Sequence, residues 1–193
     1  MTDGAGAVAF HGTLVRLAVR RLDTAHGAFE AHVCENLHTR EPMLALALGD
    51  VRGPEPLLAR VHSSCVTSEV YGACDCDCAI QLGEALAAVA RAGRGVVFYL
   101  SQEGRGAGFS AKARDRMLVQ ASLHRLTTFD AYDEMGLGRD QRRYDEVLAA
   151  RGMLGIEASF LLLSNNPDKQ AALARLGDPI AGATRLDAPA SPW

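Results

Sequence analysis

The sequence predicts an α/β protein: a single domain with a mixed β-sheet, a strand-rich N-terminal half, and helices packed on the sheet in the C-terminal half. Apolar and polar residues alternate in short segments of residues 13–48, as in half-buried strands. After residue 78, short apolar runs alternate with segments of helical period. The chain has 193 residues, 48% of them hydrophobic, which is enough for one ordinary core.

The N-terminal half is expected to form an antiparallel meander that ends in a strand at residues 57–62. Cys34 is expected to be buried or half-buried. The three histidines of this half, His26, His32 and His38, are interpreted as surface or strand-edge residues and not as ligands. The meander is predicted to have strands at 28–33 and 43–48, and turns near 23–27, 39–42 and 53–56.

The C-terminal half supplies the helices and two short buried strands. Asn166 is predicted to cap the last helix, with Pro167 in its first position. The domain is expected to span residues 1–186, followed by a flexible tail at 187–193 that contains two prolines. The predicted order is a helix from Ile80 to Gly93 or Gly95, a strand at 96–100, a helix at 111–126, an irregular acidic segment at 127–138, a helix at 141–151, a strand at 159–163 and the last helix up to Gly177.

Charge and hydropathy exclude several classes of function. The net charge of −3 gives no general attraction to nucleic acid or to an anionic membrane. No run approaches the length of about 18 apolar residues that spans a bilayer. The N-terminus lacks the basic start and apolar core of a secretory signal. We therefore expect a cytoplasmic protein whose thiols stay reduced.

Four of the five cysteines lie between residues 65 and 78, and such a cluster of thiols most often holds zinc. Three of them would leave a coordination position open, as in a catalytic site, whereas Cys74 as a fourth ligand would give a closed structural site. A disulfide is the weaker interpretation because the number of cysteines is odd and neighbouring cysteines are poor partners.

Other polar groups follow predicted strands. Arg60, just before the cysteines, suits a phosphate, and Glu103 after a buried strand could accept from a guanine edge. Lys169 falls in a first helical turn, where the macrodipole disfavours a cation unless an anion binds there. Each group also has a plain interpretation as a solvated arginine, a loop ion pair or a surface lysine.

The order and spacing of these motifs resemble the GTP cyclohydrolase II family, which opens the imidazole ring of GTP at the start of riboflavin synthesis. Ten residues separate Cys65 from Cys76, and Cys78 follows after one more residue. The resemblance extends from Arg60 to about Leu176. It also rests on Glu103-Gly104-Arg105, on Asp140-x-Arg142 and on Asn165-Asn166-Pro167-x-Lys169.

The resemblance implies zinc on Cys65, Cys76 and Cys78, Mg²⁺ with the phosphates of a purine nucleoside triphosphate, and a homodimer. Asp140 would act as proton acceptor and Arg142 as the nucleophile that takes the guanylyl group. Charge stabilisation at the α-phosphate is an easier physical account of that arginine, because a guanidinium has no free lone pair. The nucleotide-binding residues implied are Arg60, Val61, His62, Ser63, Ser64, Gln81, Glu103, Gly104, Arg105, Thr128, Ser164 and Lys169.

The mechanism implied is that zinc lowers the pKa of a water, hydroxide adds to C8 of the purine, and C8 leaves as formate. Several residues depart from the family pattern on the base side: Ser64, Asp75, Ser101, Arg116 and Tyr132. These departures predict a diverged paralogue with a different purine nucleotide or an arrested ring opening. A non-catalytic, zinc-stabilised nucleotide-binding module is the alternative, and thiol redox chemistry is a third interpretation.

Overall fold

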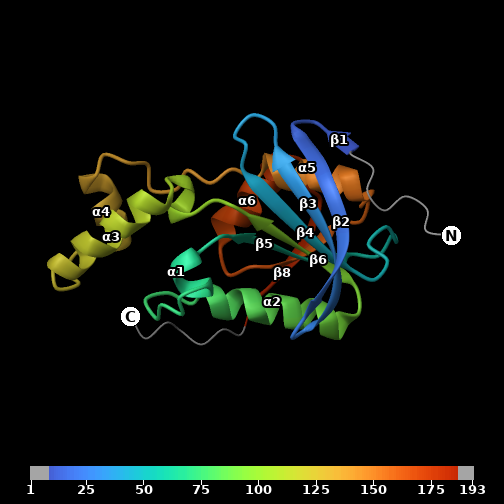
Figure 1. The fold of residues 1–193 in the computed structure, drawn as a ribbon, viewed down its shortest axis with the longest axis horizontal. Helices are drawn as coiled ribbons and strands as arrows, with labels where there is room; N and C mark the ends of the chain where they lie inside the picture. The colour runs from blue at the N-terminus through green and yellow to red at the C-terminus, as the bar shows by residue number, and fades with distance from the viewer. Residues whose placement is uncertain (1–8, 187–193) are drawn as a thin grey trace.

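The structure, a computed structural model, describes residues 9–186 (Figure 1). The predicted flexible tail at 187–193 lies outside the described residues. The strands are β1 (Ala9–His11), β2 (Leu14–Thr24), β3 (Gly27–Asn36), β4 (Pro42–Leu48), β5 (Leu57–Ser63), β6 (Gly95–Leu100), β7 (Phe160–Leu163) and β8 (Ile180–Thr184). The helices are α1 (Val66–Glu69), α2 (Cys78–Ala92), α3 (Phe109–Ala121), α4 (Thr128–Glu134), α5 (Asp145–Leu154) and α6 (Pro167–Arg175), with a 3₁₀ turn η1 (Gly104–Gly106).

All eight strands join one mixed sheet in the order β1-β2-β3-β4-β6-β5-β7-β8. Strands β1 to β4 form an antiparallel meander, and β4 also pairs antiparallel with β6. The remaining strands, β6, β5, β7 and β8, run parallel to one another. The predicted mixed sheet, with its strand-rich N-terminal half, is therefore confirmed.

Helices cover both faces of the sheet, so the fold has three layers (Figure 1). On one face, Val147 and Leu154 of α5 and Leu173 of α6 pack into the largest cluster of buried residues. On the other face, Val89 of α2 packs with Phe29 and Val97 of the sheet. Burying both faces explains why the central strands read as continuous apolar runs.

The parallel strands β5, β6 and β7 end at the same edge of the sheet. Segments that leave this edge carry Ser64 after β5, Glu103 after β6 and Ser164 after β7. Ligands of open α/β sheets bind outside the carboxyl ends of the strands, where loops can present side chains and backbone groups. This edge is therefore the place to look for a site.

Helices α3 and α4 lie to one side of the layered body (Figure 1). They contact each other, and α3 also contacts η1. The segment 127–138 was predicted to be irregular, and this is wrong for its first part because residues 128–134 form α4. Thr127 and Asp130 form a capping box there: Thr127 Oγ1 accepts from the Asp130 amide, and the Asp130 carboxylate accepts from the Thr127 amide.

Several predicted boundaries also need correction. The helix expected at 141–151 begins at Asp145 and continues to Leu154, so Asp140 and Arg142 lie in the preceding loop. The helix expected at 111–126 runs from Phe109 to Ala121, and β1, α1 and β8 were not predicted. In contrast, Gly93 ends α2 with φ of +68°, and Asn166 caps α6, as predicted.

Cys34 is buried, and His26 and His38 are exposed, as expected. His32 was expected at the surface or at a strand edge, but it is only 6% exposed, because β3 lies inside the sheet between β2 and β4. None of the helices in residues 9–186 combines the length and the apolar character needed to cross a bilayer.

Candidate active site

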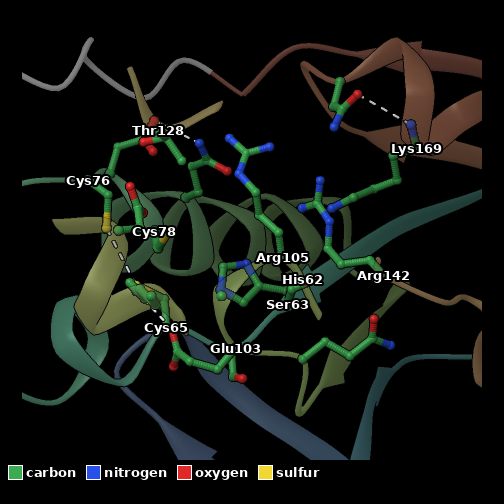
Figure 2. Close-up of a pocket in the computed structure, with 18 of the residues that line it drawn as sticks. His62, Ser63, Cys65, Cys76, Cys78, Glu103, Arg105, Thr128, Arg142 and Lys169 are labelled. Carbon is green, nitrogen blue, oxygen red and sulfur yellow. Dashed lines mark hydrogen bonds and ion pairs between the residues drawn. The ribbon is translucent and has the colours of Figure 1, made fainter. Parts of the chain in front are cut away.

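A cavity of about 390 Å³ opens at the carboxyl edge of β5, β6 and β7 and extends to α3 and α4 (Figure 2). Most of the predicted site residues line it. Val61 and Asp140 do not, although each contacts a residue that does. The predicted residues on the cavity wall are Arg60, His62, Ser63, Ser64, Cys65, Cys76, Cys78, Gln81, Glu103, Gly104, Arg105, Thr128, Arg142, Ser164 and Lys169.

Three thiols meet at one end of the cavity. The sulfur atoms of Cys65, Cys76 and Cys78 all lie within 4.8 Å of one another, which suits a single metal ion. Cys65 lies two residues after the end of β5, and Cys78 begins α2, so two elements position the cluster. The side chain of Cys74 is exposed and outside this group, with Sγ 3.6 Å from the Gly72 carbonyl oxygen. The geometry thus favours three ligands over a closed four-cysteine site.

The donor set fits zinc, because thiolates are the soft ligands that zinc prefers and three of them leave a fourth position open. Hydrogen bonds from Cys76 and Cys78 hold the pKa of Cys65 far below its ordinary value, so a thiolate is favoured at Cys65. A thiolate is the form that binds a metal ion.

Lys112 of α3, which was not predicted, touches this cluster. Its Nζ donates to Cys65 Sγ at 2.7 Å and to Glu103 Oε1 at 2.8 Å. The other oxygen of Glu103 accepts from the Val66 amide at 2.8 Å. Burial alone would lower the pKa of Lys112, but the bonds to Cys65 and Glu103 raise it above its usual value. Glu103 therefore holds the Lys112 ammonium next to Cys65, a predicted metal ligand.

Cations gather at the other end of the cavity, where Arg142 and Lys169 lie across from the cysteines (Figure 2). Arg60, on β5, is 5% exposed and donates to the Leu163 carbonyl oxygen at 2.9 Å and to Gln81 Oε1 at 2.7 Å. Asp77 in turn accepts from Gln81 at 2.7 Å. Burial lowers the pKa of Arg60 to about 10, so it stays charged at neutral pH.

Lys169 is 6% exposed, although it lies in the first turn of α6. Its Nζ donates to the Val61 carbonyl oxygen at 2.7 Å. Val61 does not line the cavity, but its carbonyl group positions Lys169, which does. Burial, followed by the charges of Arg60 and Arg142, lowers the pKa of Lys169 to about 7. A buried lysine next to two arginines is costly unless an anion joins them.

Asp140 is exposed and holds Arg142 by a two-pronged ion pair, with Arg142 Nε 2.9 Å from Asp140 Oδ1. Burial would raise the pKa of Asp140, but the hydrogen bonds from Arg142 lower it below its usual value. The predicted catalytic pair is thus in direct contact. In this arrangement Arg142 faces the cavity and Asp140 orients it.

The buried His62 of β5 belongs to a partly buried network that was not predicted. Its Nε2 lies 2.7 Å from Glu69 Oε1, and the Tyr99 hydroxyl donates to Glu69 Oε2 at 2.6 Å. The His62 and Tyr99 rings stack with centroids 5.7 Å apart. Burial lowers the pKa of His62. The network fixes the wall of the cavity beside α1.

The loop after β6 connects the two ends. Gly106 has φ of +86° and lies against the backbone of Gln141, so an added Cβ would come within 2.7 Å of the Gln141 carbonyl carbon. Gln141 donates its amide to the Arg105 carbonyl oxygen at 2.9 Å. The Tyr132 hydroxyl donates to the Gly104 carbonyl oxygen at 2.7 Å. This loop therefore fixes the position of the segment that carries Arg142 and the position of α4.

A third group of charges lines the cavity on the α3 side. Arg116 Nε lies 3.2 Å from Asp75 Oδ2 and 3.9 Å from Asp115 Oδ2. Asp115 is 3% exposed, and within residues 9–186 its Oδ1 has no hydrogen-bond partner. Arg116 and Asp75 were noted as departures from the family pattern, whereas Asp115 was not predicted.

One signal could have indicated these α3 residues. Lys112, Asp115 and Arg116 are spaced three and four residues apart and share a helix face with the buried Val119. Charged residues in line with a buried valine indicate a polar site on an inward-facing surface. Glu69 and Tyr99 gave no such signal, because only the tertiary fold brings them together.

Comparison with known proteins identifies the family. The GTP cyclohydrolase II family profile matches residues 15–184. The chain belongs to the GTP cyclohydrolase II family. It is 38% identical over 161 residues to GTP cyclohydrolase-2 of Teredinibacter turnerae, covering 83% of this chain and 79% of that protein. The family predicted from the sequence, and with it an enzyme of the GTP cyclohydrolase II type, is confirmed.

Other relatives are longer than this chain. It is 36% identical over 183 residues to the riboflavin biosynthesis protein RibBA of Cytophaga hutchinsonii, which covers 94% of this chain but 44% of that protein. RibBX, a two-domain 3,4-dihydroxy-2-butanone 4-phosphate synthase from A. baumannii, shares the fold with a TM-score of 0.50 at 17% identity. That match covers 89% of this chain and 40% of RibBX.

Proposed function

We propose that this protein hydrolytically opens the imidazole ring of GTP or a close relative at C8, releasing formate and pyrophosphate, as an enzyme of riboflavin biosynthesis. The observation that carries the proposal is the pairing of three convergent thiols with buried cations in one cavity. The names of the relatives and the matched family support GTP as the substrate.

Each part of the chain has a physical role in this proposal. Cys65, Cys76 and Cys78 would hold zinc, whose Lewis acidity lowers the pKa of water next to C8. Arg60 and Lys169, together with Mg²⁺, would bind the phosphates, since buried cations bind phosphate strongly. Arg142, oriented by Asp140, would face the α-phosphate and stabilise charge there while a water molecule attacks the α-phosphorus and pyrophosphate leaves.

The base side supports a narrower possibility, a diverged paralogue with altered substrate or arrested product. Arg116 lines the cavity and pairs with Asp75, and the family pattern has different residues at both positions. The convergence of cysteines and cations in one cavity, together with the family match, supports an enzyme over the non-catalytic module. A cytoplasmic homodimer is part of the proposal through the family resemblance.

The test is to incubate zinc-loaded protein with GTP and Mg²⁺ and to measure formate, pyrophosphate and product mass separately. Equal release of both, with a diaminopyrimidine product, is the expected result for ring opening. Pyrophosphate without formate would support the arrested paralogue. Absence of both products, from GTP and from other purine triphosphates, would contradict the enzymatic proposal.

A further inference from the structure

A buried carboxylate on α3 has no protein partner for one of its oxygens. Asp115 is 3% exposed and lines the cavity, yet its Oδ1 has no hydrogen-bond partner in residues 9–186. Leaving a buried charged acceptor unsatisfied is costly. Burial raises the pKa of Asp115 above its usual value, and the nearby Arg116, Arg105, Thr128 and Lys112 oppose this rise. Asp115 Oδ1 can therefore accept a hydrogen bond from a ligand.

The other carboxylate of this wall is already engaged. Glu103 was predicted to accept from a guanine edge, but its two oxygens accept from the Lys112 ammonium and from the Val66 amide. Its side chain is 12% exposed and anchors the lysine beside Cys65. Asp115, one helical turn after Lys112, carries the free acceptor instead.

Resting on the proposed function, we infer that Asp115 is the residue that selects a guanine base, by accepting hydrogen bonds from its N1–H and its exocyclic amine. A carboxylate has the two acceptors that these adjacent donors require. Adenine presents an unprotonated N1 at the same place, so the carboxylate would meet a lone pair and reject it. The neighbouring Arg116, which also lines the cavity, would donate to the guanine O6.

The expected selectivity follows from counting hydrogen bonds. Inosine lacks the exocyclic amine and loses one charge-assisted bond, which corresponds to about 10- to 100-fold weaker binding. Xanthosine carries an oxygen at that position, which the carboxylate repels. Asp115→Asn keeps the shape but replaces one acceptor by an NH₂ donor, so it should bind the xanthosine nucleotide more tightly than the guanosine nucleotide.

The experiment measures equilibrium binding of the α,β-methylene triphosphates of guanosine, inosine, xanthosine and adenosine to the zinc-loaded protein with Mg²⁺. Unmodified protein should bind guanosine best, and Asp115→Asn should invert the order of guanosine and xanthosine. Asp133→Asn is the matched control, because Asp133 lies exposed on α4 and pairs with Arg139. The control should leave the order of the four nucleotides unchanged.

Two results would overturn the inference. One is equal weakening of all four nucleotides by Asp115→Asn, and the other is an unmodified protein that binds inosine and guanosine equally well. The second measurement needs no variant, so the inference remains testable if Asp115→Asn does not fold. Formate is followed in the same samples with GTP. Guanine selectivity without formate would contradict the ring-opening proposal alone, and formate without selectivity would contradict the assignment of Asp115 alone.

Discussion

The strand ends and the α3–α4 pair contribute to the same cavity in different ways. The strand ends carry Arg60, Glu103 and Ser164, which match the family motifs, on segments fixed by the sheet. The α3–α4 side carries Asp115, which no family motif indicated, and Arg116 and Tyr132, where the sequence departs from the family pattern. Thr128 of α4 is the residue on this side that matches the family. Because α3 and α4 pack mainly on each other and on η1, they can change without disturbing the sheet.

This difference suggests how one reaction can be kept while the preference for the base changes, because the two depend on different parts of the fold. Metal and phosphate contacts tolerate little displacement, and rigid strand ends hold them most accurately. The base contact that we infer for Asp115 lies on a peripheral helix pair, whose residues could vary while the reaction stays the same. The following predictions test whether the two regions are as separate as this comparison suggests.

The largest effect is expected in the cysteine cluster. Cys76→Ser should abolish stoichiometric zinc binding and formate release, because two thiolates and a hydroxyl bind zinc poorly. Metal content of the purified protein and formate release measure this. Cys74→Ser is the matched control and should keep its zinc, since its side chain is exposed and outside the cluster. Loss of zinc from Cys74→Ser would instead indicate a four-cysteine structural site.

The next effect links the two regions, because Lys112 of α3 contacts the predicted zinc ligand Cys65. Lys112→Met should weaken zinc binding by about 10- to 100-fold, since the ammonium no longer orients the thiolate or offsets its charge. Competition with a chromophoric chelator gives the affinity. Arg114→Met, exposed on the same helix, should leave the affinity unchanged. Equal affinities for the two variants would show that the helix pair has no part in metal binding.

Lys169 gives the strand-end region a measurable pH dependence. Its pKa of about 7 in the free protein lies below the usual 10.5, and the ionisable groups facing it are Arg60, Arg142, Asp140 and Cys78. A bound triphosphate should raise this pKa, so binding at pH 8 should take up close to one proton. Affinity should then fall by up to about tenfold per pH unit above 7.

Calorimetry in buffers of different ionisation enthalpy measures this uptake. Lys169→Gln should remove it, and Arg175→Gln, exposed at the end of α6, should not. The same pKa also predicts how stability depends on pH. Between about pH 7 and 10.5, Lys169 is protonated in the unfolded chain but largely deprotonated in the folded protein. The free energy of unfolding of the free protein should therefore rise with pH in this range. A flat profile in both experiments would contradict the buried position of Lys169.

The smallest effect concerns the separate stability of α4. Thr127→Ala removes the cap that accepts from the Asp130 amide and should cost about 1 kcal/mol locally. Hydrogen exchange of the α4 amides should accelerate about fivefold, while exchange in β5 and β6 stays the same. Ser110→Ala, exposed on α3, serves as the control. Equal acceleration in the sheet would show that the helix pair and the sheet unfold together.

The sequence by itself determined the mixed sheet, the three metal-ligand candidates and the cap of α6. The sheet and the cap depend on local signals, namely alternation along strands and Asn166 before Pro167. The choice of Cys65, Cys76 and Cys78 over a set that includes Cys74 came from the family resemblance. The motifs also indicated the family, because their order along the chain is specific.

Only the tertiary structure decided which polar side chains form hydrogen bonds to other protein groups and which do not. Glu103 lies beside the glycine-rich loop and Asp115 lies in α3. Nothing in the sequence around either carboxylate indicates which of them has hydrogen-bond partners within the protein. Packing of α3 against η1 brings Lys112 to Glu103, while Asp115 Oδ1 has no hydrogen-bond partner in residues 9–186. The hydrogen bond from Lys169 to the Val61 carbonyl oxygen likewise joins residues 108 positions apart. Such contacts depend on distance in space, which spacing along the chain does not encode.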